Sequence, residues 1–242
     1  MMPAALDLQL VAVGALAGAV RGFSGFGAGL VLAPVLVATL GPTTAVPLLL
    51  LIEIGASCYL VPGALRQCRR EIVAHLSAPA CLLFPAGTLL LLRLDAATVR
   101  VGVSLLVLGM ALFLATGWRL QGSSSRPLLV ATGGLSGLLN GFGGIGGPPV
   151  IFLLMSTPGD SRDTRADFIA FFALVNVAAL ITFASLGLLS TALLRWLLVI
   201  FPAFAAGMVA GSRRFRQASE ATYRLAVLLI VIASALFGLL AS

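Results

Sequence analysis

The sequence has no lysine, a single histidine and only three cysteines. Its 15 basic residues are therefore all arginine, and they outnumber 8 acidic residues to give a net charge of +7. Cys58, Cys68 and Cys81 are odd in number and show no CxxC or histidine-paired spacing. Neither a disulfide framework nor a metal site is therefore indicated.

Charged residues of any kind make up only 10% of the chain, against about 25% in soluble domains. Hydrophobic residues make up 60%, and the mean hydropathy is +1.13. A globule of 242 residues could not bury that much apolar surface, so a soluble, disordered or collagen-like chain is excluded. No segment combines a dense cluster of basic residues with the composition of a soluble domain, so we expect no nucleic-acid partner. We interpret the arginines as signals that set the orientation of the chain in a membrane.

The chain divides into eight apolar stretches, each of a length that suits a membrane helix. The linkers between them are short and carry arginine, and none could hold a soluble domain. The start lacks the basic region of a cleavable signal peptide, so we expect the first helix to insert and stay. The sequence thus predicts one all-α polytopic membrane domain over residues 1–242, with stretches at about 6–40, 45–65, 73–92, 101–118, 128–156, 168–189, 193–211 and 225–241.

The first and fifth stretches are too long for one span, and glycine runs at Gly22–Gly29 and Gly141–Pro149 interrupt them. Glycine and proline at this density break helices, and non-helical backbone survives at membrane depth only inside protein or beside a cavity. The two runs also match each other at an offset of 119 residues, and Ala97–Phe113 matches Ala221–Phe237 at an offset of 124. The chain is therefore predicted to be an internal duplication, with halves at about 1–120 and 121–242.

The arginines favour an inverted arrangement of the two halves. If all eight stretches cross the membrane, six loop arginines lie on one face and eight on the other. If the first and fifth stretches are re-entrant hairpins, each half has three spanning helices and the split becomes eleven to three, as the positive-inside rule expects. Both termini then lie outside the cytoplasm of a cell (inner) membrane, and the three outer arginines are Arg93, Arg100 and Arg195.

Four strongly polar residues are predicted inside the membrane: Arg21, Glu53, Asn140 and Asn176. The repeat offsets align Arg21 with Asn140 and Glu53 with Asn176. Such residues are costly in a bilayer and usually act at a site, but Arg21 and Glu53 could instead neutralise each other. The asparagines could likewise serve as interhelical hydrogen-bonding groups.

The glycines also have two interpretations. Gly14, Gly18 and Gly22, with their counterparts Gly133, Gly137 and Gly141, form small-xxx-small faces that favour close helix packing. A helix break beside the prolines instead exposes backbone N–H groups and a helix N-terminus, which together bind anions. We favour this second interpretation for Gly25, Gly27, Gly144, Gly146 and Gly147. Neither run fits a nucleotide-binding loop.

Gly22-Phe-Ser-Gly25 also reads as GxSG, the serine motif of rhomboid intramembrane proteases. Such an enzyme needs a histidine on a facing helix, and the only one, His75, lies at a loop edge. The second half has Gly143 in place of Ser24. A protease is therefore the weakest of the alternatives.

The segment Leu135–Val150, together with Arg21–Gly29 and Pro34, resembles the sulfite exporter TauE/SafE family of membrane permeases. The resemblance implies secondary transport, usually export, of small sulfur-containing anions such as sulfite or organosulfonates, driven by an ion gradient and without a cofactor. Arg21 departs from the family, in which many members carry an uncharged residue there.

We therefore expect a proton-coupled, alternating-access anion transporter, with a passive anion channel as the alternative. Glu53 is the expected proton-coupling residue, and the expected partners are the anion, protons and bilayer lipid; the sequence does not determine the oligomeric state. The predicted substrate-binding residues are Arg21, Ser24, Gly25, Gly27, Asn140, Gly144, Gly146, Gly147 and Asn176.

Overall fold

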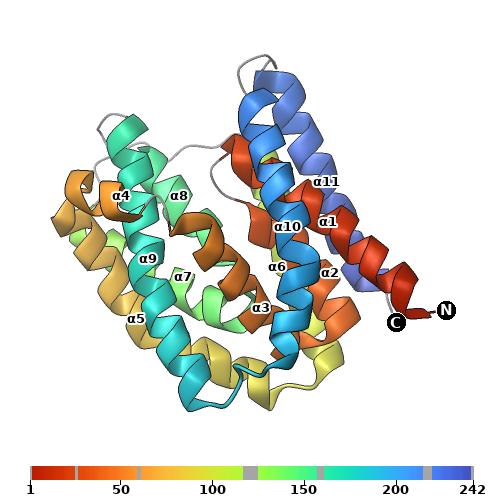
Figure 1. Ribbon diagram of the computed structural model, residues 1–242. Coiled ribbons are helices and arrows are strands. Elements are labelled where there is room, and N and C mark those ends of the chain that lie inside the picture. The colour runs from red at the N-terminus through yellow and green to blue at the C-terminus, as the bar shows by residue number, and fades with distance from the viewer. Residues whose placement is uncertain are drawn as a thin grey trace. The chain divides into compact units, whose positions relative to one another are not determined.

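The computed structural model describes residues 2–24, 27–58, 61–116, 125–156, 161–214 and 220–240, and every regular element in these ranges is an α-helix (Figure 1). The all-α prediction is confirmed. The helices are α1 (Met2–Ser24), α2 (Ala28–Leu40), α3 (Pro42–Ser57), α4 (Val61–Gln67), α5 (Arg70–Arg93), α6 (Ala96–Thr116), α7 (Arg126–Gly143), α8 (Gly147–Ser156), α9 (Ser161–Ser185), α10 (Ala192–Arg214) and α11 (Glu220–Leu240).

Each predicted apolar stretch coincides with one helix or with two consecutive helices. Within the described residues, α5, α6, α9 and α10 are long and apolar enough to cross a membrane. The pair α3 and α4, bent by 74°, would be a fifth span if counted as one. The chain is therefore a polytopic membrane protein by the length and composition of its helices. Three helices begin earlier than their predicted stretches: α9 at Ser161 instead of about 168, α6 at Ala96 instead of about 101, and α11 at Glu220 instead of about 225.

The helices form two compact units that do not follow the sequence halves. Unit 1 comprises residues 1–49, 95–117 and 190–242, and unit 2 comprises residues 50–94 and 118–189. Unit 1 therefore joins α1, α2 and α6 from the first half to α10 and α11 from the second. Unit 2 joins α4 and α5 from the first half to α7, α8 and α9 from the second.

In unit 1, α1 lies along α10 in close backbone contact (Figure 1). A methyl group at Gly18 would overlap the Phe204 carbonyl, and one at Gly22 would overlap the Met208 carbonyl. The approach is reciprocal, because a methyl group at Gly211 of α10 would overlap the Ala19 carbonyl. These positions need glycine for packing, and the two helices run parallel.

Unit 2 contains a matching pair formed by α5 and α7. A methyl group at Gly137 would overlap the Ala80 carbonyl, and one at Gly141 would overlap the Phe84 carbonyl. The partner helix α5 also contributes a glycine, because a methyl group at Gly87 would overlap the Leu138 carbonyl. The packing interpretation of the glycine faces is therefore correct in both units.

The contacts of the α1–α10 pair and of the α5–α7 pair involve residues that correspond to each other in the sequence repeat. Gly18 and Gly137 are 119 residues apart, and their contact residues Phe204 and Ala80 are 124 residues apart. The ion pairs between these helices also recur at the same offsets, but the acidic and basic residues have changed places. Asp7 pairs with Arg195 at 3.7 Å between α1 and α10, whereas Arg126 pairs with Glu71 at 2.7 Å between α7 and α5.

Unit 2 also contains an ion pair whose carboxylate is buried. The fully buried carboxylate of Asp167 on α9 accepts hydrogen bonds from the Arg69 backbone N–H at 2.6 Å and from its Nε at 2.7 Å. The Arg69 Nη2 lies 2.7 Å from the same carboxylate. Since Arg69 is the N-cap residue of α5, the pair fixes the start of α5 against α9.

Gly137→Ala should destabilise the protein, because the added methyl group would enter the α5–α7 contact. Overpacking of this kind costs about 1–3 kcal/mol, which should lower the melting temperature of detergent-solubilised protein followed by size-exclusion chromatography. Gly63→Ala is the control, since a methyl group at Gly63 of α4 meets nothing within 4 Å. Equal melting temperatures for the two variants would contradict the packing role.

Asp167→Asn should also destabilise the protein, because it leaves the guanidinium of Arg69 without its carboxylate. Breaking a buried pair from one side costs about 3–5 kcal/mol. The matched control is Glu71→Gln, whose pair with Arg126 is exposed and should contribute little. A thermal denaturation series in detergent should rank Asp167→Asn well below both Glu71→Gln and the wild type; the reverse order would show that the buried pair is dispensable.

Candidate functional site

The break between α7 and α8 in unit 2 is defined by Gly144. This residue follows the last residue of α7 in the left-handed conformation, with φ of 70°, and its N–H donates to the Asn140 carbonyl at 2.9 Å. Glycine adopts this conformation without the steric cost that a side chain imposes. Gly144 therefore ends α7 and redirects the chain.

After this turn the chain doubles back along α7. The Ser136 hydroxyl donates a hydrogen bond to the Gly146 carbonyl, although ten residues separate them. A methyl group at Gly146 would overlap the Ser136 carbonyl and come within 2.7 Å of the Asn140 Cβ. The start of α8 is therefore held against the middle of α7, with Asn140 beside it.

The N-terminus of α8 offers few backbone donors. The first four N–H groups of a helix have no intrahelical partner, but α8 begins Gly147-Pro148-Pro149 and proline has no N–H. Around a methyl group built at Gly147, the nearest atom is Phe172 Cζ of α9, at 3.9 Å. The helix start therefore keeps the Gly147 N–H as a donor, and the Phe172 ring lies within van der Waals range of this position.

Asn140 lies beside this helix start, and Asn176 lies one turn after Phe172 on α9. Asn140 is half-buried, and Asn176 of α9 is 6% exposed. Within the described residues, neither side-chain amide has a hydrogen-bond partner. We call Asn140, Gly147, Phe172 and Asn176 the α8 site.

The corresponding break in unit 1 lies between α1 and α2. Gly27 caps α2 with φ of 88°, and its carbonyl accepts the Leu30 N–H at 3.1 Å. No proline occurs in the first turn of α2, so its start retains the N–H groups of Ala28 and Gly29. Gly25 lies outside the described residues, and for Ser24 the structure describes only its backbone, at the end of α1.

The two predicted intramembrane charges lie on different helices. Arg21 is in the last turn of α1, where a cation is favoured by the helix dipole, and Glu53 is in α3. Both are half-buried and neither is without a partner. Mutual neutralisation and action on substrate both stay predictions for these residues.

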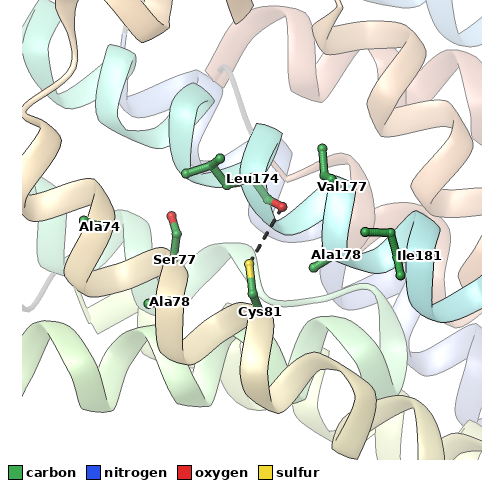
Figure 2. Close-up of a pocket in the computed structure, with 8 residues that line it drawn as sticks. All are labelled: Ala74, Ser77, Ala78, Cys81, Leu174, Val177, Ala178 and Ile181. Carbon is green, nitrogen blue, oxygen red and sulfur yellow. Dashed lines mark hydrogen bonds between the residues drawn. The ribbon is translucent and has the colours of Figure 1, made fainter.

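A separate groove of about 430 Å³ lies between α5 and α9. Figure 2 shows its small α5 residues facing larger α9 residues, with the Cys81 thiol donating to the Leu174 carbonyl at 3.8 Å. No charged residue lines it, so it is unsuited to an anion. Its lining residues are Ala74, Ser77, Ala78, Cys81, Leu174, Val177, Ala178 and Ile181.

Sequence reasoning missed two residues of this region. Ser136 looks like an ordinary small residue of α7, and only its position one turn before Asn140 could have drawn attention to it. Phe172 is one of 14 phenylalanines in an apolar chain and carries no sequence signal. Within the part of the chain that the structure describes, no group of three His, Cys, Asp or Glu residues could hold a metal ion.

Comparison with protein families gives one match, to the sulfite exporter TauE/SafE model over residues 10–238. Searches of curated proteins and of solved structures gave no match. Because the family model covers nearly the whole chain, the protein belongs to the TauE/SafE family of sulfite exporters and is a membrane transporter. The predicted resemblance is confirmed.

Gly146→Ala and Gly147→Ala should differ sharply although the residues are adjacent. The first would force a methyl group into the α7 backbone, whereas the second brings it only into ordinary van der Waals contact with Phe172. We expect a large loss of folded protein for Gly146→Ala and near wild-type thermal stability for Gly147→Ala in detergent. Similar stability of the two variants would contradict the doubling back of the chain at Gly146.

Proposed function

We propose that this TauE/SafE protein exports a small sulfur-containing anion, such as sulfite or an organosulfonate, by proton-coupled alternating access. The observation that carries the proposal is the helix break at Gly144, where the start of α8 is held beside Asn140 in a chain of the exporter family.

The proposed topology is an inverted repeat with a Gly-rich re-entrant hairpin in each half, six spanning helices, and both termini outside the cytoplasm of the cell (inner) membrane. The lengths of α2 and α8, 13 and 10 residues, support it. At 1.5 Å per residue they reach about 20 and 15 Å, too short for a hydrocarbon core of about 30 Å. The return of Gly146 to Ser136 fits a hairpin, and the equivalent contacts of the α1–α10 and α5–α7 pairs support the duplication.

The chemistry of the α8 site suits an oxyanion. Each asparagine amide supplies two N–H donors, and the Gly147 N–H and the helix dipole add to them. The side-chain amides thus replace the backbone donors that Pro148 and Pro149 remove. Gly144 and Gly146 contribute by shaping the break, and Arg21, Ser24, Gly25 and Gly27 are proposed to serve the same anion from the first half.

Coupling to protons is assigned to Glu53. A carboxylate within the membrane can gain or lose a proton and so change its charge. Its negative form would repel an anion electrostatically. Arg21 would supply the opposite charge. Proton uptake at Glu53 would then admit the anion, and proton release would expel it.

The alternative is a passive anion channel, in which the same N–H donors bind the anion and Glu53 does not couple its movement to protons. The protease alternative lacks support, because the only histidine, His75, makes a 2.7 Å contact from Nδ1 to the Glu71 carbonyl of its own helix. Family membership likewise favours a transporter over an enzyme.

Transport in proteoliposomes should separate these roles. With sulfite and an imposed pH gradient, Asn176→Ala should raise KM about tenfold, because a hydrogen bond to a charged group contributes about 1.5–3 kcal/mol. Arg21→Ala should reduce transport strongly, and Glu53→Gln should abolish the response to the pH gradient. Initial rates of radiolabelled sulfite uptake measure all three.

Ser77→Ala is the matched control, since it removes a buried hydroxyl of unit 2 beside the apolar groove rather than at the α8 site. It should keep wild-type kinetics. Wild-type rates for Arg21→Ala and Glu53→Gln would reject their assigned roles. If a pH gradient drives no uphill accumulation by the wild type, the channel alternative replaces the proposal.

A further inference from the structure

A proline in the interior of α2 leaves one carbonyl of that helix without its usual donor. In an α-helix each carbonyl accepts the N–H of the residue four positions later, and proline has no N–H. Pro34 lies in the middle of α2, so it supplies no hydrogen to the carbonyl of Leu30. Both residues are buried, and Leu30 is only 4% exposed. A buried carbonyl is costly to leave unpaired, so a donor from elsewhere in the protein is needed.

A serine on another helix of unit 1 supplies this donor. The Ser234 hydroxyl of α11 donates to the Leu30 carbonyl at 3.2 Å, although the two residues are 204 positions apart. Ser234 is itself buried. One turn later on α11, Gly238 permits a close approach, because a methyl group there would lie 2.9 Å from the Pro34 Cβ. One face of α11 therefore both packs against Pro34 and satisfies the carbonyl that Pro34 leaves unpaired.

The same hydroxyl has a second acceptor in its own helix. Ser234 Oγ lies 2.8 Å from the carbonyl of Val231, three residues earlier in α11. A serine hydroxyl carries a single hydrogen, so it serves Leu30 and Val231 together only by sharing that hydrogen. Ser234 can therefore release Leu30 and still keep a hydrogen-bond partner.

We propose that Pro34 and Ser234 form a latched hinge, in which α2 bends at Pro34 and the bond from Ser234 to Leu30 holds α2 in the conformation of this structure. The inference rests on the proposed function, because alternating access requires elements that move between two arrangements. A helix that lacks one internal hydrogen bond bends at that point more easily than an intact one. Transfer of the Ser234 hydrogen to Val231 frees the first turn of α2, which directly follows the break at Gly27.

A double-mutant cycle tests the latch. Ser234→Ala should lower the melting temperature of the detergent-solubilised protein by about 5 °C, because the buried Leu30 carbonyl loses its donor. Ser234→Thr keeps the hydroxyl and should restore wild-type stability. In the Pro34→Ala background, the new N–H at residue 34 serves Leu30. Adding Ser234→Ala there should change the melting temperature by less than about 1 °C.

Ser212→Ala is the matched control, because the Ser212 hydroxyl also donates to a carbonyl three residues earlier, that of Val209 in α10 at 2.8 Å, but is exposed. Its melting temperature should equal that of the parent in both backgrounds. Equal losses from Ser234→Ala with and without Pro34→Ala would overturn the latch. If Pro34→Ala does not yield folded protein, Pro34→Val restores the same N–H and takes its place in the cycle.

Sulfite transport in proteoliposomes under a pH gradient tests the hinge. Pro34→Ala should lower the maximal rate several-fold, because the restored hydrogen bond resists bending and conformational steps commonly limit such rates. Pro202→Ala is the matched control, since it removes an exposed proline from the interior of α10. It should keep a rate near that of the wild type.

A wild-type maximal rate in folded Pro34→Ala would overturn the hinge and leave the proposed function intact. An equal loss in Pro202→Ala would also overturn it, because the effect would then be general to prolines within the helices. A wild type that does not move sulfite would instead reject the proposed function, and the hinge with it. The melting-temperature cycle would still report on the bond between Ser234 and Leu30.

Discussion

Direct contact between helix backbones is the constraint on which the other features depend. In a bilayer the hydrophobic effect does not drive helices together, so association relies on van der Waals packing and hydrogen bonds. The glycines of α1 and α7 allow the carbonyls of α10 and α5 to approach to within contact distance. Gly87 on α5 and Gly211 on α10 make the same kind of close contact from the partner helices. Each pair is therefore held by glycines on both helices, and neither helix can turn about its axis.

This locking extends to the candidate site. With α7 fixed against α5, Ser136 and Asn140 keep one orientation, and the Ser136 hydroxyl can hold the Gly146 carbonyl. The start of α8 is then fixed as well. Two prolines follow it, so the site depends on side-chain amides where other helix starts use backbone N–H groups. The position of the α8 start thus follows from close helix packing together with the Ser136 hydrogen bond.

The sequence predicted the apolar stretches, the glycine breaks and the packing glycines, because composition and spacing determine these locally. It identified Asn140 and Asn176, because an amide is conspicuous in an apolar helix. The partner helices were not predictable, since spacing within α1 gives no information about which helix faces it. Phe172 was missed because phenylalanine is ordinary in this chain, and the buried Asp167 was missed because its partner Arg69 is 98 residues away.

The break in unit 1 resembles that in unit 2 in position but not in chemistry. The α2 start keeps its backbone donors and has Arg21 near it in sequence, whereas the α8 start has prolines and two amides. The inverted ion pairs of Asp7 and Arg126 show the same divergence. Glycines that face a carbonyl, such as Gly18 and Gly137, recur at the repeat offset, whereas Arg21 and Asn140 at the same offset differ in side chain.

The exchange of partners between the predicted halves means that neither half is self-sufficient. The first helix of each half packs against the third stretch of the other half, α1 on α10 and α7 on α5. Two separate half-length polypeptides could make these contacts only as an interlocked dimer in which each contributes its first helix to the other. Either half expressed alone would lack a partner for its glycine face.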